Sequence, residues 1–218
     1  MINYILNVAS VSPLSKNKPR QAIVLCHGYG GDGKDISTLA ISWRRFLPDA
    51  VFLCPNAPEI CADNPQGYQW FDMRSENEEI MLEKSLAAAE KLNTLLDQVV
   101  NNFQLESSNL ALVGFSQGCM ISIQTGLQRK EQINCIIGYS GKVINQKHLL
   151  ENINSKPKIF LMHGANDSIV PPTHLLEAKD YLKKCGLKIK TKLFKNCEHS
   201  ISVEGTSLGL AFLKKNLL

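Results

Sequence analysis

Six short, strand-like runs of apolar residues recur along the chain, and longer segments of mixed polar and apolar residues separate them. The runs cover residues 23–26, 51–54, 110–113, 135–139, 159–162 and 189–194. Runs of this length are typical of strands that are buried on both faces of a sheet. Strands that alternate with helical segments predict the α/β class, with a mainly parallel central sheet and helices on both faces.

The segments between the runs carry helical signals. In residues 80–103, apolar side chains recur at three- and four-residue spacing, which predicts a long amphipathic helix. Residues 172–185 begin with a proline and are followed by Gly186, a pair of signals typical of helix boundaries. We also expect helices around residues 36–46 and over residues 119–127.

Composition is that of an ordinary globular protein. The 218 residues are 44% hydrophobic and 20% charged, without a break in composition, so we expect one domain spanning residues 1–218. The net charge of +4 is spread along the chain, which gives no support to nucleic-acid binding.

The seven cysteines are odd in number and form no CxxC pair, which favours reduced, buried thiols. Without a secretory leader or an apolar stretch of about 18 residues, we expect a cytoplasmic protein with no integral membrane contact.

Residues 114–118 read Gly-Phe-Ser-Gln-Gly and stand where a strand-like run turns into a helical segment. In that context, the GxSxG pattern predicts a nucleophile elbow with Ser116 as the nucleophile. The turn brings neighbouring backbone close, so side chains at Gly114 and Gly118 would collide with it. The helix behind Ser116 directs unpaired N–H groups toward the reacting centre. The N–H of Gln117 is therefore the first predicted oxyanion donor.

A serine hydroxyl becomes a good nucleophile when a base removes its proton, and a carboxylate orients that base. In chains with this elbow the order is nucleophile, acid, base, each at a strand end. Asp167 follows the fifth strand-like run and is the best-placed acid. His199 follows the sixth run and is the predicted base. Two of the five histidines are excluded as the base. His27 precedes the serine in the chain, and His174 follows Asp167 too closely in sequence to reach Ser116 from the opposite side of the elbow.

The second oxyanion donor is expected in the glycine-rich segment after the first strand-like run, residues 25–31. We assign it to the N–H of Tyr29, because glycines allow this segment to approach Ser116 closely. A tight turn before the next helix explains the same glycines and stays open as an alternative.

Residues 55–79 show neither helical nor strand periodicity and contain three prolines. A long irregular segment in a compact domain is usually functional or mobile. We expect Trp70 and Phe71 to bind substrate by lining a groove for an acyl chain. The alternative, that these rings anchor the segment onto the core, stays open beside it.

Lysines alternate with less polar residues near the end of the chain, at Lys188, Lys190 and Lys192. The simplest interpretation is a solvated strand face. A second interpretation is weak peripheral association with anionic membrane surfaces.

Six motifs occur in order along almost the whole chain: LCHGYGGDG, CPNAPE, QWFD, GFSQG, HGANDSIVPP and EHS. Together they resemble the phospholipase/carboxylesterase family, which includes the acyl-protein thioesterases. The resemblance implies an α/β-hydrolase fold, no metal or organic cofactor, and action on carboxylic esters, lysophospholipids or acyl thioesters. It also implies Ser116, Asp167 and His199 as the catalytic triad, with the N–H groups of Tyr29 and Gln117 as the oxyanion hole.

The chain departs from the eukaryotic-type thioesterases at two places near the acyl-binding side. Those proteins usually carry Leu at the position of Tyr29, and a Met-Gly pair where this chain has Cys197-Glu198. The chain is therefore more similar to the bacterial carboxylesterase branch of the family.

The sequence thus predicts a carboxylesterase that works through an acyl-enzyme on a small-molecule or lipid ester. One alternative is a lysophospholipase or acyl-protein thioesterase that acts on long acyl chains. The other is a protein that keeps the fold and binds a ligand without catalysis. The sequence makes no prediction about the oligomeric state.

Overall fold

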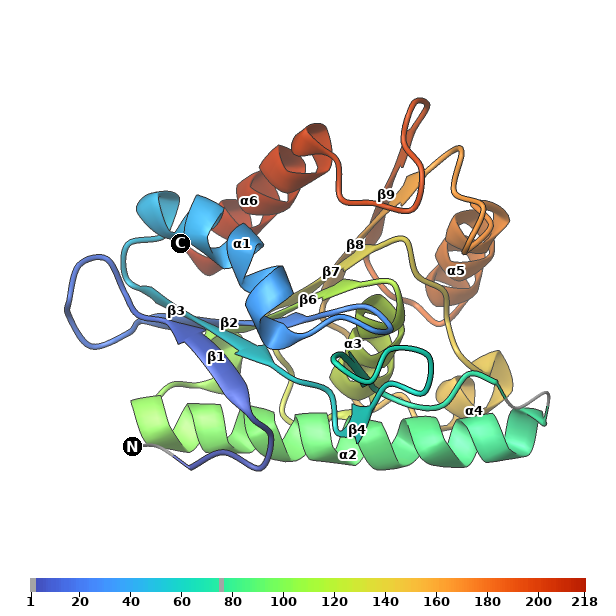
Figure 1. Ribbon diagram of the computed structural model, residues 1–218. Helices are drawn as coiled ribbons and strands as arrows, with labels where there is room; N and C mark the ends of the chain where they lie inside the picture. The colour runs from blue at the N-terminus through green and yellow to red at the C-terminus, as the bar shows by residue number, and fades with distance from the viewer. Residues whose placement is uncertain (1–2, 75–76) are drawn as a thin grey trace.

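The computed structural model describes residues 3–74 and 77–218. Its main sheet has seven strands in the order β1-β3-β2-β6-β7-β8-β9 (Figure 1). These strands are β1 Val8–Val11, β2 Gln21–Cys26, β3 Ala50–Pro55, β6 Leu110–Phe115, β7 Cys135–Tyr139, β8 Lys158–Gly164 and β9 Ile189–Phe194. The helices are α1 Gly33–Trp43, α2 Glu78–Phe103, α3 Gln117–Gln128, α4 Gln146–Glu151, α5 Thr173–Lys184 and α6 Val203–Leu217.

The main sheet is parallel except at one edge. β1 pairs antiparallel with β3, and every other neighbouring pair in this sheet is parallel. The register sets Phe115 opposite Tyr139 and Gly164 opposite Phe194. The carboxyl ends of the central strands therefore meet along one edge, and the loops that carry functional residues in α/β proteins leave from there. The predicted mainly parallel sheet is confirmed.

Helices cover both faces of the sheet, as predicted (Figure 1). On one face, α1 and α6 enclose a core that includes Trp43, Tyr139 and Leu213. On the other face, α2 and α3 enclose a second core that includes Leu92 and Ile123. Both cores are apolar and tightly closed, so the sheet gives the loops at its carboxyl edge a rigid base.

The long helix expected over residues 80–103 spans Glu78–Phe103, and the one expected over 172–185 spans Thr173–Lys184. The segment expected around 36–46 is α1 followed by a 3-10 turn, Arg44–Phe46. The pattern did not anticipate the edge strand β1, the short helix α4, the C-terminal helix α6 or the two short strands β4 Glu59–Ile60 and β5 Tyr68–Gln69. Another 3-10 turn, Ser107–Asn109, precedes β6.

Residues 55–79 are less irregular than their sequence indicates. Two short strands, β4 Glu59–Ile60 and β5 Tyr68–Gln69, pair antiparallel. Tyr68 also forms a bridge with Gly31, because Gly30 N–H donates to Tyr68 O at 2.9 Å and Tyr68 N–H donates to Gly31 O at 2.8 Å. The segment is thus tied by backbone hydrogen bonds to the glycine-rich loop that follows β2.

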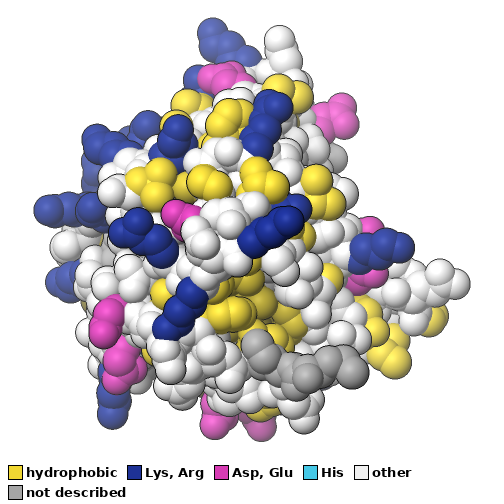
Figure 2. Space-filling model, turned by 90° about the vertical axis from the view of Figure 1, so that its left-hand side faces the viewer, with side chains coloured by type: hydrophobic (Ala, Val, Ile, Leu, Met, Phe, Trp, Pro, Cys, Tyr) yellow, Lys and Arg dark blue, Asp and Glu magenta, His cyan; other side chains and the backbone are white. Residues whose placement is uncertain are grey.

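The alternating lysines lie on and beside β9, the last strand of the main sheet. Lys190 Nζ lies 4.6 Å from the centre of the Phe160 ring, and Lys192 Nζ lies 2.8 Å from Glu204 Oε1. These lysines therefore cover aromatic surface and pair with an acid, as amphipathic side chains on a sheet edge commonly do. On the face shown in Figure 2, lysines and arginines lie at several separate places with acidic and hydrophobic side chains between them. Within residues 3–74 and 77–218, no helix combines the length and apolar character that a bilayer crossing requires.

Candidate active site

Ser116 stands at the sharp turn between β6 and α3. Its backbone has φ 54° and ψ −118°, a conformation that costs free energy for any residue other than glycine. A Cβ atom on Gly114 would lie 2.2 Å from Gly118 O, and one on Gly118 would lie 2.1 Å from Cys26 O. The predicted steric need for both glycines is confirmed, since a side chain at either position would push backbone out of place.

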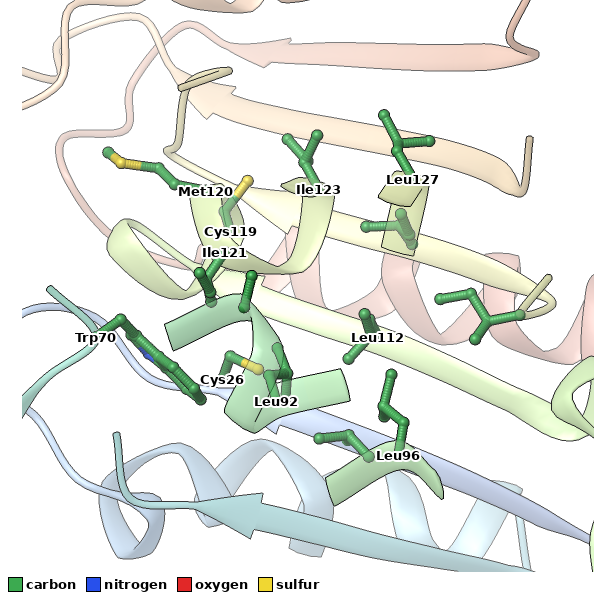
Figure 3. Close-up of a cluster of buried hydrophobic side chains, with 14 of the residues drawn as sticks. Cys26, Trp70, Leu92, Leu96, Leu112, Cys119, Met120, Ile121, Ile123 and Leu127 are labelled. Carbon is green, nitrogen blue, oxygen red and sulfur yellow. The ribbon is translucent and has the colours of Figure 1, made fainter. Parts of the chain in front are cut away.

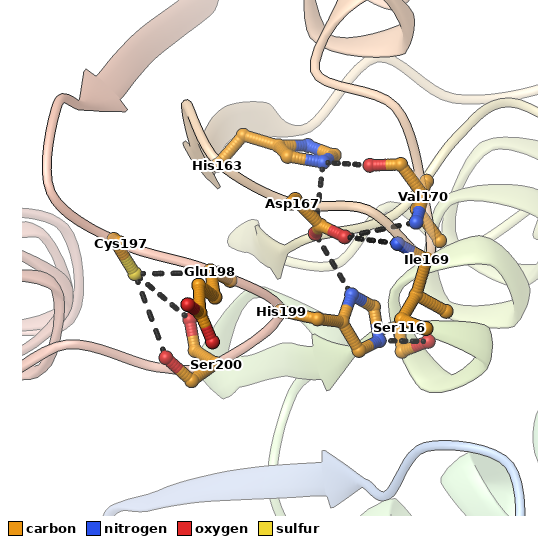
Figure 4. Close-up of polar contacts among 9 residues, drawn as sticks. All are labelled: Ser116, His163, Asp167, Ile169, Val170, Cys197, Glu198, His199 and Ser200. Atoms are coloured by element: carbon orange, nitrogen blue, oxygen red, sulfur yellow. Dashed lines mark hydrogen bonds and ion pairs between the residues drawn. The ribbon is translucent and has the colours of Figure 1, made fainter.

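Three polar side chains from three different strand ends meet beside this turn (Figure 4). His199, in the loop after β9, has its Nε2 atom 2.9 Å from Ser116 Oγ. Its Nδ1 atom lies 2.8 Å from Oδ2 of Asp167, which follows β8. Because a carboxylate accepts hydrogen bonds, Nδ1 carries the proton and Nε2 is left to accept from the serine hydroxyl. The structure thus brings together the three side chains that the sequence analysis selected.

The Asp167 carboxylate is completely buried and fully hydrogen-bonded. Its Oδ1 atom accepts from the N–H groups of Ile169 at 3.0 Å and Val170 at 2.9 Å. Burial acts to raise the pKa of Asp167, but hydrogen bonds from Val170 and His199 outweigh it, so the pKa lies below its usual value. The acid therefore stays ionised at neutral pH and can stabilise a protonated imidazole.

The glycine-rich loop after β2 lies against the serine. A Cβ atom on Gly28 would lie 3.3 Å from Ser116 Cβ, which shows how closely the two backbones approach. Within residues 3–74 and 77–218, no hydrogen bond uses the backbone N–H of Tyr29 or of Gln117. The N–H groups of Tyr29, which follows Gly28 in this loop, and of Gln117, which follows Ser116, are thus available to a ligand oxygen.

A network of buried hydrogen bonds supports this loop. The side chain of Gln117 accepts from Trp70 N–H at 2.8 Å and donates to Phe71 O at 2.7 Å. The Trp70 indole N–H donates to His27 O at 3.0 Å. The His27 imidazole accepts from Ala57 N–H at 2.9 Å through Nε2, so its Nδ1–H donates to Gly28 O. Burial lowers the pKa of His27, and the neutral ring it favours is the form that both hydrogen bonds need.

The expectation that Trp70 lines a substrate groove is not met. Its ring is fully buried beside Cys26 and Leu92 (Figure 3), where it packs against the core and anchors residues 55–79. An indole with its N–H satisfied by backbone gains more from burial than from exposure in a groove. Phe71 is also in the core, but one part of it contributes to the wall of a cavity.

Two cavities lie near the serine, one toward each face of the sheet. One, of about 480 Å³, lies beside α1 and is lined by Tyr29, Leu39, Phe115 and Ile201, among others. The other, of about 460 Å³, is lined by Phe71, Met81, Met120 and Val143, among others. Both are apolar in part and large enough for a small ester or part of an acyl chain.

The remaining histidines have partners of their own. His174 pairs with Glu177 on α5 at 2.7 Å and does not reach Ser116, as expected. His163 Nε2 lies 3.3 Å from Asp167 Oδ2, a contact that the sequence analysis did not anticipate. Its position at the end of a buried strand, four residues before the acid, is the signal that was present in the sequence.

Comparison with known proteins places this arrangement in a family. A model of the phospholipase/carboxylesterase family matches residues 7–217. The crystal structure of esterase PE8 is similar, with 33% identity, a TM-score of 0.92, and coverage of 97% of this chain and 99% of that chain.

Sequence relatives agree with this placement. The chain is 30% identical over 207 residues to acyl-protein thioesterase 1 of Aspergillus fumigatus, covering 84% of this chain and 82% of the relative. It is 23% identical over 205 residues to esterase YpfH of Escherichia coli K12, covering 92% and 85%. The protein belongs to the phospholipase/carboxylesterase family, with the α/β-hydrolase fold that its sequence predicts, and is an ester-cleaving hydrolase.

Proposed function

We propose that the protein is a carboxylesterase in which Ser116, His199 and Asp167 form the catalytic triad. The observation that carries the proposal is the unbroken chain of hydrogen bonds from Ser116 Oγ through His199 to Asp167. The backbone N–H groups of Tyr29 and Gln117 form the oxyanion hole. Their support is the close approach of the loop at Gly28 to Ser116 and their freedom from other hydrogen bonds among the described residues.

The reaction follows from these positions. His199 Nε2 takes the proton from Ser116 Oγ as that oxygen attacks the acyl carbon, and the carbonyl oxygen, now negative, is held by the two N–H groups. Asp167 stabilises the protonated imidazole, which then gives its proton to the departing alcohol oxygen. An acyl-enzyme remains on Ser116. Water, deprotonated by His199, attacks it by the same route and releases the carboxylic acid.

The first test is the Ser116→Ala variant. Loss of one triad member is expected to lower turnover by about 10⁴-fold or more. Hydrolysis of p-nitrophenyl acetate at the wild-type rate by purified Ser116→Ala protein would rule the proposal out. A fluorophosphonate probe complements this test, because labelling of Ser116 in folded protein excludes the alternative of a binding protein without catalysis.

A second candidate function is hydrolysis of long acyl chains in lysophospholipids or acyl thioesters. It is favoured by the cavity that Phe71, Met81 and Met120 line, since methionines adapt to chains of varied shape. This cavity begins one helical turn from the serine, because Met120 N–H donates to Ser116 O at 3.2 Å.

Chain length separates the two candidates. If the cavity holds the acyl chain, kcat/KM for p-nitrophenyl esters rises from acetate to octanoate, by up to about fourfold for each buried methylene, at about 0.8 kcal/mol per methylene. The Met120→Trp variant, which fills the cavity, then removes the gain on octanoate and leaves acetate hydrolysis unchanged. A profile that falls from acetate onward assigns the protein to short esters.

A further inference from the structure

His163 is a buried imidazole that the proposed reaction does not use. It lies at the end of β8 with 1% of its side chain exposed. Its Nε2 atom is 2.8 Å from Val170 O and 3.3 Å from Asp167 Oδ2 (Figure 4). Both of those oxygens are acceptors, so Nε2 must carry the hydrogen and the ring must be a donor at this atom. The single Nε2–H is therefore shared between two acceptors, with the shorter contact to Val170 O and the longer one to Asp167 Oδ2.

The same imidazole acts on the acid by two routes. Directly, its Nε2–H approaches Oδ2, the oxygen that also accepts from His199 at 2.8 Å. Indirectly, it binds Val170 O, and the N–H of that residue donates to Oδ1 at 2.9 Å. Because one ring holds both the carboxylate and the turn that donates to it, rotation of the Asp167 side chain would break contacts on both oxygens.

The charge state of His163 decides whether this contact helps. A protonated ring would compete with His199 for Oδ2, whereas a neutral ring donates a hydrogen bond without adding a charge. Burial lowers the pKa of His163, although Asp167 acts in the opposite sense, and the other titratable groups that influence the ring are His199 and His174. The ring is therefore neutral where the esterase reaction needs it to be.

We propose that His163 is a positioning residue, whose neutral Nε2–H fixes the Asp167 carboxylate in the orientation that holds His199 toward Ser116. The inference rests on the proposed triad and deepens it. Residues that orient a catalytic group through a hydrogen bond affect the rate without touching substrate. His163 therefore acts on kcat through the basicity and orientation of His199, and leaves KM nearly unchanged.

Three substitutions test the role of the N–H group. His163→Gln can place an amide N–H near the position of Nε2, whereas the shorter His163→Asn cannot reach it and His163→Leu has no donor. We expect the Asn and Leu variants to lose about tenfold or more in kcat with little change in KM, the effect of losing a hydrogen bond to a charged group. The Gln variant is expected to stay within about threefold of wild type. Circular dichroism and thermal unfolding show which variants are folded.

Two further readouts separate positioning from mere loss of stability. Without the hydrogen bond from His163, the negative charge on Oδ2 is less neutralised and stabilises the protonated form of His199 more strongly. The acidic limb of the kcat/KM profile therefore moves to higher pH in the Asn and Leu variants. The NMR resonance of the proton between His199 and Asp167 shifts or broadens in these variants and is retained in the Gln variant. If His163→Leu does not fold, the comparison of Gln with Asn carries the test.

The outcome for His163 is distinguishable from that for the triad. If folded His163→Asn and His163→Leu keep the wild-type kcat, pH profile and resonance while Ser116→Ala is inactive, the positioning role is wrong and the triad stands. If Ser116→Ala is itself fully active, the proposed function fails, and the His163 inference fails with it.

Discussion

At the scale of single residues, the strained backbone of Ser116 is held by what surrounds it. Nothing in the serine favours φ 54°; the conformation persists because β6 and α3 are both fixed by their own hydrogen bonds and packing. Gly118 has a Cβ position 2.1 Å from Cys26 O, so α3 can pack against the end of β2 only because that position is empty. The backbone geometry of Ser116, the proposed nucleophile, thus depends on the absence of a side chain at Gly118.

Gly118→Ala is expected to lower the free energy of unfolding by about 3 kcal/mol, because backbone must move to accept the methyl group. Urea unfolding followed by tryptophan fluorescence measures this change. Gly31→Ala is the matched control, since the nearest atom to a Cβ there is an ordinary 3.4 Å away. Equal unfolding midpoints for Gly118→Ala and wild type would show that the elbow accepts a methyl group at this position without loss of stability, contrary to the close contact in the structure.

The candidate site residues that the sequence could single out are those with a fixed place in the chain order. Ser116, Asp167 and His199 each follow a strand, and the order nucleophile, acid, base selects them from five histidines and many acids. His163 and the Gln117 side chain escaped because their partners are fixed by folding alone: a carboxylate four residues on, and backbone 46 residues before Gln117. The four-residue spacing from His163 to Asp167 is a weak local signal, and no local pattern encodes the contacts of the Gln117 side chain.

At the scale of elements, the segment from β4 to β5 braces the loop that carries Tyr29. The Tyr68–Gly31 bridge and the Trp70 indole bond to His27 O fix both ends of that loop. The Gln117 side chain in turn holds the backbone at Trp70 and Phe71. The Gln117 side chain thus joins α3, behind the proposed nucleophile, to the segment that supports the loop of Tyr29, the proposed second oxyanion donor.

Gln117→Leu leaves the Trp70 N–H and Phe71 C=O buried without partners, and each costs about 1–3 kcal/mol. We expect a lower free energy of unfolding, faster amide hydrogen exchange at Trp70, and a reduced kcat, although the backbone N–H of residue 117 is unchanged. Gln132→Leu is the control, because Gln132 is exposed and accepts a single hydrogen bond from Lys156 N–H. An unchanged rate of amide hydrogen exchange at Trp70 in the Gln117→Leu variant would show that other contacts hold this segment in place.

Elements with a strong internal period were the predictable ones. The apolar positions of α2 recur at helical spacing over 26 residues, a pattern that packing context cannot easily override. β1 has four residues at the edge of the sheet with three of them half-buried, so it lacks the continuous apolar run of a central strand. α6 contains Gly205 and Gly209, which lower helix propensity; a Cβ on Gly209 would lie 2.1 Å from Tyr139 Oη, so close packing against β7 explains the second glycine.

At the scale of the whole molecule, burial of neutral histidines links stability to pH. His27 and His163 are both buried, and burial lowers the pKa of each from the usual 6.5. Below pH 6.5 the unfolded chain therefore binds protons that the folded protein does not. Their contribution to stability is fully present above that pH and is lost progressively as the pH falls toward the folded-state pKa. Asp167, with its lowered pKa, adds a further loss only at much lower pH.

We expect the free energy of unfolding to fall below pH 6.5 by up to about 1.4 kcal/mol per pH unit for each of these two histidines. Urea titrations between about pH 7.5 and pH 5 measure the slope. His163→Gln removes one titrating group and is expected to reduce the slope by about half. His174→Gln, on the partly exposed surface of α5, is the control and should retain it. A stability that is constant over this range would mean that both imidazoles accept a proton in place.

The seven cysteines report on the integrity of the whole fold. All are free thiols, and all except Cys185 are buried. Burial raises the pKa of Cys26, Cys54, Cys119 and Cys135 to about 12, so their reactive thiolate forms are scarce at neutral pH. Access favours Cys185, which follows the last residue of α5 and is only half-buried. Which cysteines an alkylating reagent modifies therefore depends on whether the two hydrophobic cores stay folded around the buried thiols.

Brief treatment of native protein with iodoacetamide at about pH 8 is expected to alkylate Cys185 alone, whereas treatment in concentrated urea alkylates all seven cysteines. Peptide mapping by mass spectrometry identifies the modified sites. In the Cys185→Ser variant the native protein should stay unlabelled over the same period, because reaction at the other thiols waits for the cores to open. Rapid native labelling of Cys119, which packs behind Ser116 beneath Gly138 and Gly141, would reveal that the elbow opens separately from the rest of the sheet.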